Sequence, residues 1–298
     1  MTANDSAIRP STIAVGGGTV LAALGVVSFS LSFPATVWSL SGFGPWSATG
    51  LRGALAAVVA AVGLAVARAP FPARRYWPGL LVVAVGCVVG FPLLTTFALG
   101  ISSTAHTAVV VGLLPLATAT FAALRSGVRP SRTFWCAALA GAAVVLGFTL
   151  QQSGGALTLA DLYLLGALVV CAAGYAEGGR LARELPGWQV IAWGVLAAAP
   201  VMVVTAGVAV TFEPVHLTVR ALTGLAYIAA VSQFGGFVLW YRGMAEIGIP
   251  KASQLQLAQP LLTLGWAVLL LGETPSPAAP LAALGVLACI AVTQRARG

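Results

Sequence analysis

The chain has 298 residues, of which 59% are hydrophobic and 7% are charged, and its mean hydropathy is +0.98. A soluble domain is roughly 25% charged, so 15 basic and 7 acidic residues are too few to cover one of this length. This composition excludes soluble enzymes, nucleic-acid-binding proteins and disordered proteins, and it predicts a polytopic membrane protein. The four cysteines lie inside apolar runs, where we expect small buried side chains rather than disulfides or metal ligands.

Ten segments approach the roughly 20 apolar residues that a transmembrane helix needs. They cover residues 12–32, 46–67, 78–98, 101–124, 133–150, 161–181, 188–211, 218–240, 252–271 and 277–294. Strands of a membrane barrel are about ten residues long and alternate in hydrophobicity, whereas these segments are continuous runs of Leu, Ala, Val and Gly. The sequence therefore predicts an all-α membrane protein with ten transmembrane helices.

The basic residues are distributed unevenly between the connections. The termini and the even-numbered connections hold 13 of the 15 Lys and Arg residues, the odd-numbered connections hold only Arg220, and Arg52 falls within the second span. Because basic residues stay on the cytoplasmic side, we expect both termini there, in a bacterial inner membrane. Residues 1–11 form the N-terminus before a retained first span, and the net charge of +8 implies no nucleic-acid partner.

The two halves of the chain resemble each other. A shift of 145 residues places 115–131 on 260–276 with eight identities in 17 positions, including matched Pro, Gly and Pro-Ser. We infer two five-helix repeats, residues 12–150 and 156–298. Because five is odd, the second repeat must cross the membrane in the opposite sense. Inverted repeats open one midplane site to either side in turn, which favours a transporter.

Arg52 is the first candidate for contact with a substrate, because a charged group inside hydrocarbon is costly and marks a functional site. It lies about 10 Å inside the outer end of the second span at 1.5 Å per residue. The guanidinium either meets a substrate carboxylate or locks two helices together through backbone carbonyls.

Three amides and two prolines are further candidates. Gln233 lies near the middle of the eighth span, and Gln256 and Gln259 face the same side of the ninth. Amides donate and accept hydrogen bonds, which suits a zwitterionic ligand, although hydrogen bonding between helices would also explain them. We expect Pro115 and Pro260 to kink their helices, which can free carbonyls toward a pathway.

The remaining polar candidates are His106 in the fourth span, which either binds substrate or is structural, and Thr95 and Tyr175, which add a hydroxyl and an aromatic wall. No Asp or Glu lies near the middle of a span, so a buried carboxylate proton relay is not expected. The sequence also lacks a Walker motif, metal-ligand spacing and a catalytic constellation. It predicts no ATP drive, no cofactor, no metal and no enzyme activity.

The run from Pro260 to Leu-Gly-Glu273, followed by Pro-Ser and a last helix of small residues, resembles the EamA family of the drug/metabolite transporter superfamily. Within it, the chain is most similar to bacterial amino-acid exporters of the YddG type. The resemblance implies efflux of small metabolites through a cavity lined by spans 1–4 and 6–9. It leaves the fifth and tenth helices peripheral, as the expected contact of a homodimer. Many relatives carry an acidic residue where this chain has Gln259.

The sequence thus predicts an exporter of amino acids or similar small neutral metabolites that works by alternating access around a midplane cavity. A multidrug or other-metabolite exporter of the same superfamily and a facilitative, channel-like pore are the alternatives. A membrane enzyme is the least favoured, because no catalytic group is visible.

Overall fold

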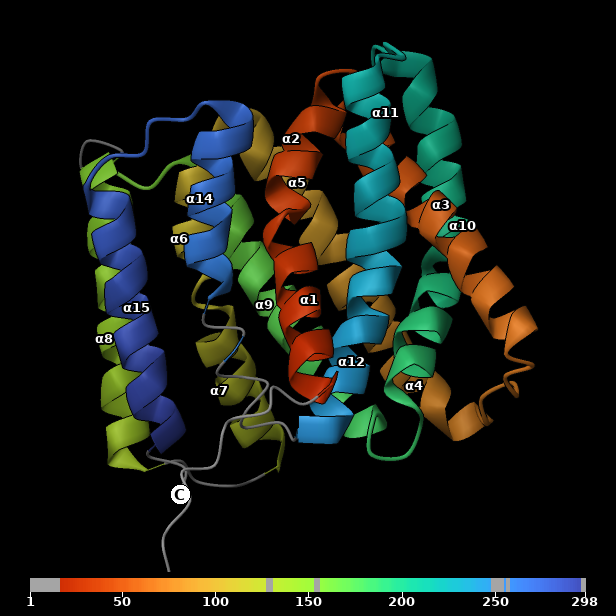
Figure 1. The fold of residues 1–298 in the computed structure, drawn as a ribbon, viewed down its shortest axis with the longest axis horizontal. Coiled ribbons are helices and arrows are strands. Elements are labelled where there is room, and N and C mark those ends of the chain that lie inside the picture. Colours follow the sequence, from red (N-terminus) through yellow and green to blue (C-terminus); the bar gives the residue numbers. More distant parts are fainter. Residues whose placement is uncertain (1–16, 127–130, 153–155, 248–254, 256–257, 296–298) are drawn as a thin grey trace, which may run out of the picture.

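The computed structural model describes residues 17–126, 131–152, 156–247, 255 and 258–295. This part of the chain folds into one bundle of helices (Figure 1). Within it the single extended pairing is an isolated bridge between Phe43 and Val215. The all-α prediction is therefore confirmed.

The first half contains five helical spans, three of which are interrupted. The first consists of α1 (Gly17–Ser30) and α2 (Ser32–Leu40), and the second is α3 (Pro45–Val66). The third passes through η1 (Arg74–Tyr76), α4 (Trp77–Val83), the π-helical segment η2 (Ala84–Gly90) and α5 (Phe91–Ile101). The fourth consists of α6 (Thr104–Val111) and α7 (Leu114–Ser126), and the fifth is α8 (Arg132–Gln152).

The second half follows the same plan. Its first two helices are α9 (Leu159–Leu181) and α10 (Gly187–Phe212). Its third span passes through α11 (Val219–Ala226), the π-helical segment η3 (Tyr227–Gly235) and α12 (Gly236–Ile247). The last two helices are α14 (Gln259–Leu271), which ends at Gly272 in the left-handed conformation with φ of 67°, and α15 (Ala278–Arg295).

Each of the ten predicted spans overlaps a helical span, the ninth only over its described residues, and the first continues to Leu40 instead of ending at residue 32. Seven helices are long and apolar enough to cross a membrane, and three shorter apolar helices accompany them in the described part of the chain. The third helix is longer than predicted, because it runs from Arg74 to Ile101. These helices confirm an all-α membrane protein with ten helices.

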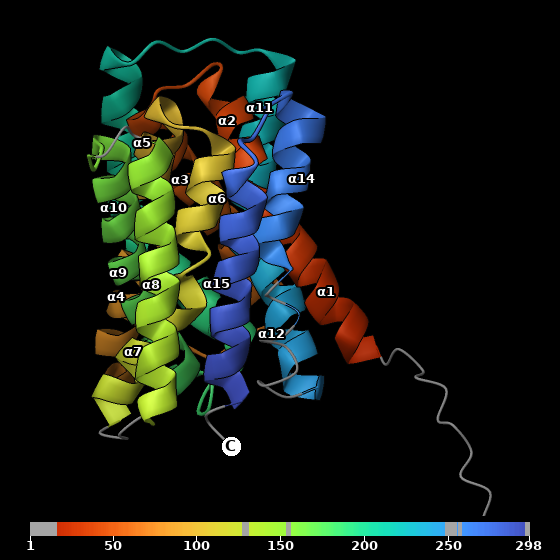
Figure 2. The same cartoon turned by 90° about the vertical axis from the view of Figure 1, so that its left-hand side faces the viewer.

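The helices pack in pairs that join the two halves. The main pairs are α3 with α10, α1 with α12, α8 with α15, and α9 with the span that contains α4, η2 and α5. Figures 1 and 2 both show α8 and α15 side by side at the periphery. Glycines permit two of these close approaches, because a Cβ on Gly50 would lie 2.5 Å from the amide nitrogen of Ala206 and one on Gly86 would clash with the Val170 carbonyl.

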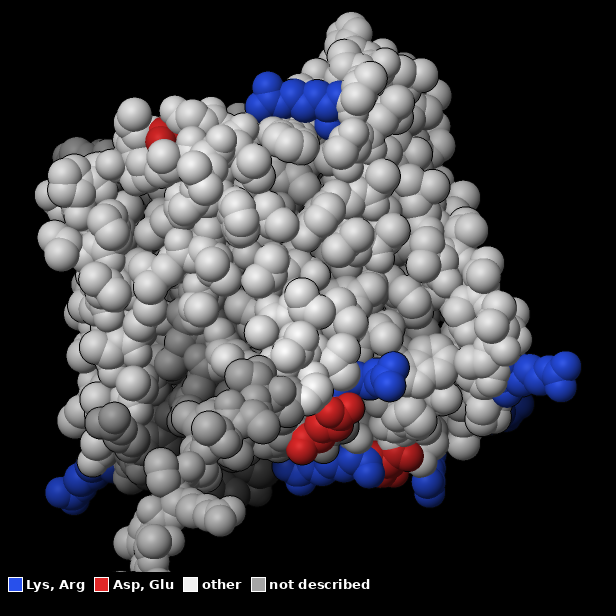
Figure 3. Space-filling model, in the orientation of Figure 1, with Lys and Arg blue, Asp and Glu red and all other residues white. Residues whose placement is uncertain are grey.

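The two ends of the bundle differ in charge. The beginning of α1 and the end of α15 lie at the same end (Figure 1), and most of the Lys and Arg side chains visible in Figure 3 gather there. We call this end, which carries Arg74, Arg75, Arg180, Arg183 and Arg242, the basic end. The opposite end carries the connections after α10 and α14 and is called the Glu273 end.

Candidate functional site

A central cavity lies where helices of both halves meet. Its volume is about 50 Å³, and one water needs roughly 10–15 Å³ of such space. The space therefore holds a few waters in this conformation. Its polar wall consists of Ser32, Arg52, Thr95, Tyr175, Ser232, Gln233 and Gln259.

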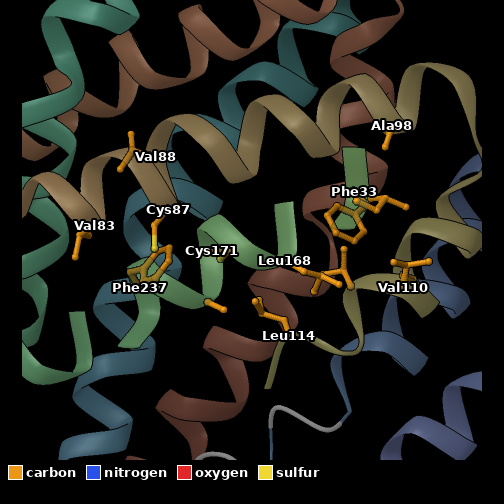
Figure 4. Packing of buried hydrophobic residues seen from close by; sticks show 14 of the residues in the cluster. Phe33, Val83, Cys87, Val88, Ala98, Val110, Leu114, Leu168, Cys171 and Phe237 are labelled. Carbon is orange, nitrogen blue, oxygen red and sulfur yellow. The ribbon is translucent and has the colours of Figure 1, made fainter. Parts of the chain in front are cut away.

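The rest of the wall is aromatic and sulfur-bearing. Phe29, Phe33, Phe91, Phe237, Cys87 and Cys171 line it, together with Val111 and Leu114. Figure 4 shows Cys87 of η2 near Phe237 of α12, with Phe33 of α2 farther along the same packed interior. The cavity is thus a small polar patch inside an apolar lining, as ligand pockets usually are.

Arg52 is the one charged side chain among the described residues of this wall. It belongs to α3 and is 8% exposed. Its Nε donates to Oε1 of Gln233 at 2.9 Å, and its Nη2 donates to Oγ of Ser232 at 3.4 Å. The Ser232 hydroxyl lies 2.6 Å from the Ser32 hydroxyl. Arg52 therefore joins the first half to η3 through neutral groups alone.

The acidic residues of the described chain all lie elsewhere. Asp161 faces His106, and Glu177 and Glu184 pair with arginines at the basic end. Glu213 and Glu273 accept from the backbone at the other end, and Glu246 is exposed. A guanidinium whose described partners are all neutral can bind an anion, because a carboxylate can accept two parallel hydrogen bonds from it.

Two π-helical segments contribute Cys87, Ser232 and Gln233 to the wall of the cavity. Residues 84–90 of η2, shifted by the repeat distance of 145, fall on 229–235 of η3. A π turn inserts an extra residue and frequently marks a functional site. The two segments touch, because Nε2 of Gln233 donates to the Cys87 carbonyl at 3.4 Å. The matched π turns therefore place Ser232 and Gln233 against Arg52.

The other predicted cavity residues divide into two groups. Thr95, Tyr175 and Gln259 line the cavity; Thr95 donates its hydroxyl to the carbonyls of Phe91 and Pro92 within its own helix, and Gln259 is the first residue of α14. Gln256 lies outside the described residues.

His106 lies away from the central cavity. Its Nε2 is 2.7 Å from Oδ1 of Asp161, and its ring stacks on Phe148. Oδ2 of Asp161 accepts from the amide and the hydroxyl of Thr158 and so caps α9. The surrounding pocket, of about 240 Å³, is at the Glu273 end. The structure therefore explains His106 as one member of a buried pair that joins α6 to α9.

The two prolines lie at helix starts. Pro115 is the second residue of α7, directly after the interruption at Gly112 and Leu113 that separates α6 from α7. Pro260 occupies the first turn of α14. Proline is favoured there because the missing N–H would have no partner in the helix. Both positions lie beside Gln259 in a second small space that shares Phe33 with the central cavity.

Two carboxylates of the second half cap helices of the first half. Glu213 accepts from the amides of Trp46 and Ser47 and from the Ser47 hydroxyl, at 2.6 to 3.1 Å. Glu273 accepts from the amides of Thr104 and Ala105, at 2.9 and 3.1 Å. Negative charge is favourable at helix N-termini. Since residues 12–150 contain no Asp or Glu, the first half has no carboxylate to cap the second half in return.

Sequence reasoning missed several cavity residues. Ser32, Ser232 and the four phenylalanines gave no individual signal, because hydroxyls and aromatic rings are common in apolar spans. The repeat distance held one usable signal: it aligns Cys87 with Ser232, and these residues lie in the two π segments. The π turns themselves have no composition by which they could be recognised.

The described residues of the cavity have the chemistry to bind an anion. Among the described residues, no three His, Cys, Asp or Glu side chains lie close enough together to hold a metal ion. Of the four cysteines expected to be buried, Cys87 and Cys171 are buried, whereas Cys289 is half-buried and Cys136 is exposed on α8. What the site presents is one guanidinium, two amides and several hydroxyls in an apolar wall.

Comparison with known proteins agrees with this architecture. The model of the EamA-like transporter family matches residues 16–150 and 158–294, one copy in each half. The chain is 44% identical over 272 residues to the uncharacterized transporter YdeK of Bacillus subtilis (strain 168), which covers 91% of this chain and 95% of that protein. It is 30% identical over 141 residues to the uncharacterized transporter YcbK of the same strain, over 44% of this chain and 45% of that protein.

A solved crystal structure has the same fold, with a TM-score of 0.64 at 22% identity, over 92% of this chain and 95% of that chain. The two family matches confirm duplicated halves, and they place the protein among multi-pass membrane transporters rather than enzymes. The chain belongs to the EamA-like transporter family.

Proposed function

We propose that the protein exports amino acids or similar small metabolites across a bacterial cytoplasmic membrane, by alternating access around the central cavity. The observation that carries this proposal is Arg52, a buried guanidinium between the halves whose described partners are all neutral. The assignment to YddG-type amino-acid exporters rests on the resemblance of the sequence, and the relatives above are named only as transporters.

The orientation is part of the proposal. We infer that the basic end is cytoplasmic, with both termini there, and that the second half is inverted relative to the first. Support comes from the arginines gathered where α1 begins and α15 ends (Figures 1 and 3), and from the positive-inside rule. The matched π segments and the pairing of helices across the halves agree with repeats related by a two-fold axis.

The central cavity is small in this conformation. A space for a few waters cannot hold an organic molecule, so the halves must separate before one binds. The carboxylates of Glu213 and Glu273 join the halves at the Glu273 end through short hydrogen bonds to helix starts, whereas the ion pair between the halves at the basic end, Arg75 with Glu184 at 3.7 Å, is exposed. We therefore infer that separation begins more readily at the basic end, which admits substrate from the cytoplasm.

Uptake of radiolabelled amino acids by proteoliposomes tests the function. Saturable uptake that is competed by unlabelled substrate supports the carrier. Flux that never saturates would indicate a channel-like pore, and saturable transport of unrelated organic cations without any amino acid would indicate a multidrug exporter. Empty liposomes provide the control.

Cysteine labelling from outside intact cells tests the orientation. Cysteine introduced at Ser276, after α14, should react with an impermeant maleimide, whereas cysteine introduced at Arg74 should react only after the membrane is opened. The opposite pattern would reverse the orientation.

We further propose a homodimer through the peripheral helices α8 and α15. Their exposed apolar side chains include Leu139, Leu281 and Leu284, at 68%, 69% and 52% exposure. The native Cys136 on α8 is also exposed, so mild oxidation in membranes should give a disulfide-linked dimer that Cys136→Ser abolishes. If the wild-type protein forms no such dimer, the exposed faces of α8 and α15 contact lipid instead, and the homodimer is refuted.

A further inference from the structure

The charges around the central cavity narrow the class of substrate, and this inference rests on the proposed transport function. An amino acid carries two charges, a carboxylate and an ammonium. Arg52 can hold the carboxylate, but the ammonium would need an anionic or strongly polar partner once it leaves water. The question is therefore which group of the cavity could accept an ammonium.

The acidic residues are accounted for by position. Asp161 is held by His106 and the start of α9, while Glu213 and Glu273 are held by the starts of α3 and α6. Glu177 and Glu184 pair with arginines, and Glu246 is exposed. The seventh, Asp5, lies in the part of the chain before Gly17 that the structure does not describe. Among the described residues, no carboxylate lines the cavity.

The hydrogen-bonding groups near Arg52 are also committed. The Gln233 oxygen accepts from Arg52, and its nitrogen donates to Cys87. The Thr95 hydroxyl donates to its own helix. Among the described residues, Nη1 of Arg52 makes no hydrogen bond. The guanidinium edge formed by Nη1 and Nη2 can therefore face a carboxylate, while the described oxygens that could face an ammonium, those of Gln233, Gln259 and the hydroxyls, carry no negative charge.

The rest of the wall is suited to an apolar body. Phe29, Phe33, Phe91, Tyr175 and Phe237 surround the polar patch, and aromatic rings pack well against flat, apolar groups. The Arg52 guanidinium beside these five rings is suited to a molecule with a single negative charge at one end. We propose that, among the small metabolites this transporter exports, the site prefers monocarboxylates with an apolar, ring-bearing body over amino acids of the same shape.

Four compounds of one shape test this directly on the wild-type protein. 3-Phenylpropionate has the carboxylate alone, phenylalanine has both charges, phenylalaninamide has the ammonium alone, and 3-phenylpropanamide has neither. Transport into proteoliposomes is measured at neutral pH, where a carboxyl with a pKa of about 4 is ionised. Empty liposomes correct for passive entry of each compound.

We expect 3-phenylpropionate to be carried with an apparent affinity at least equal to that of phenylalanine. We also expect that affinity to exceed the affinity for 3-phenylpropanamide by about tenfold or more, which is roughly 1.4 kcal/mol. Phenylalaninamide should be the poorest substrate, because its charge has the same sign as Arg52.

The remaining outcomes overturn the proposal. If phenylalanine is preferred over 3-phenylpropionate, the site recognises the ammonium, and the inference fails while export of amino acids stands. If all four compounds are carried equally, the site does not recognise the charge of the ligand, and the proposal fails. If none is carried, the inference fails, and the broader amino-acid panel then decides whether the proposed function fails with it.

Discussion

Arg52 and His106 are both buried basic side chains, each 8% exposed, yet their surroundings differ. The imidazole of His106 lies 2.7 Å from a carboxylate that is itself fixed by the start of α9. The guanidinium of Arg52 has an amide, a hydroxyl and a water-sized space beside it. The first group completes a pair within the protein, whereas the second leaves its charge uncompensated by any described residue.

The difference separates a structural role from a binding role. Removing one partner of a buried hydrogen-bonded pair is destabilising, because the other polar group is left buried without a partner. A buried charge without a counter-ion in the protein lowers the stability of the fold. Charged residues of this kind in membrane spans are usually functional. The comparison therefore predicts that changes at His106 and Asp161 act on folding, and that changes at Arg52 act on transport.

The largest expected effect is on stability, at Asp161. Asp161→Ala removes the hydrogen-bonding partner of His106 and the cap of α9, so we expect a loss of about 2–4 kcal/mol in thermal unfolding of the detergent-solubilised protein. Glu184→Ala is the matched control, because its ion pairs are 44% exposed and exposed pairs contribute roughly 0–1 kcal/mol. Similar losses in the two variants would remove the structural distinction.

At Arg52 the effect should appear in transport. Arg52→Gln should lose most transport and Arg52→Lys should retain part of it, since lysine keeps the charge but not the planar fork. Both variants should remain monodisperse in detergent. Arg220→Gln, at an exposed arginine, should transport normally. Normal transport by Arg52→Gln, or its failure to fold, would assign Arg52 to helix packing.

The amides should have smaller effects. Replacing Gln259 with Leu removes one hydrogen-bonding contact, worth about 1–2 kcal/mol or roughly five- to thirtyfold in apparent affinity. Gln233→Leu should weaken transport more, because Gln233 also holds Nε of Arg52. Gln151→Leu, at an exposed position on α8, is the control. Unchanged kinetics in both cavity variants would show that the amides only join helices.

The smallest effect is expected at Glu273. Glu273→Gln keeps an acceptor but loses the charge at the start of α6, so the Glu273 end should open more often by about 1 kcal/mol, or roughly fivefold. Faster maleimide labelling of Ala105→Cys reports this opening. Glu246→Gln, at an exposed residue, is the control and should leave the labelling rate unchanged. An unchanged rate in Glu273→Gln would show that the Glu273 carboxylate does not hold the halves together.

Sequence reasoning predicted the helices well because long apolar runs must form helices in lipid. It also singled out Arg52, Thr95, Tyr175, Gln233 and Gln259, which the structure brings to one cavity; their roles in binding stay predictions. It could not foresee that His106 faces Asp161, because the two lie 55 positions apart and Asp161 was placed at a span boundary.

The interruptions of the helices were the other feature beyond prediction. The break at Gly112 precedes Pro115 by three residues and had a sequence signal. The π turns of η2 and η3 had none, because they depend on contacts between helices distant in the chain: Gly86 approaches Val170 of α9, and Gln233 approaches Cys87. Local composition does not encode such contacts.

The central claim is that Arg52 binds the carboxylate of the substrate. It is tested most directly by one ratio, the apparent affinity for a transported carboxylate divided by that for its amide, in wild type and in Arg52→Gln. Such a cycle isolates the contact between the two groups from other effects of the substitution. We expect a ratio of about tenfold or more in wild type that falls to near one in the variant. A ratio that is unchanged in Arg52→Gln would contradict it.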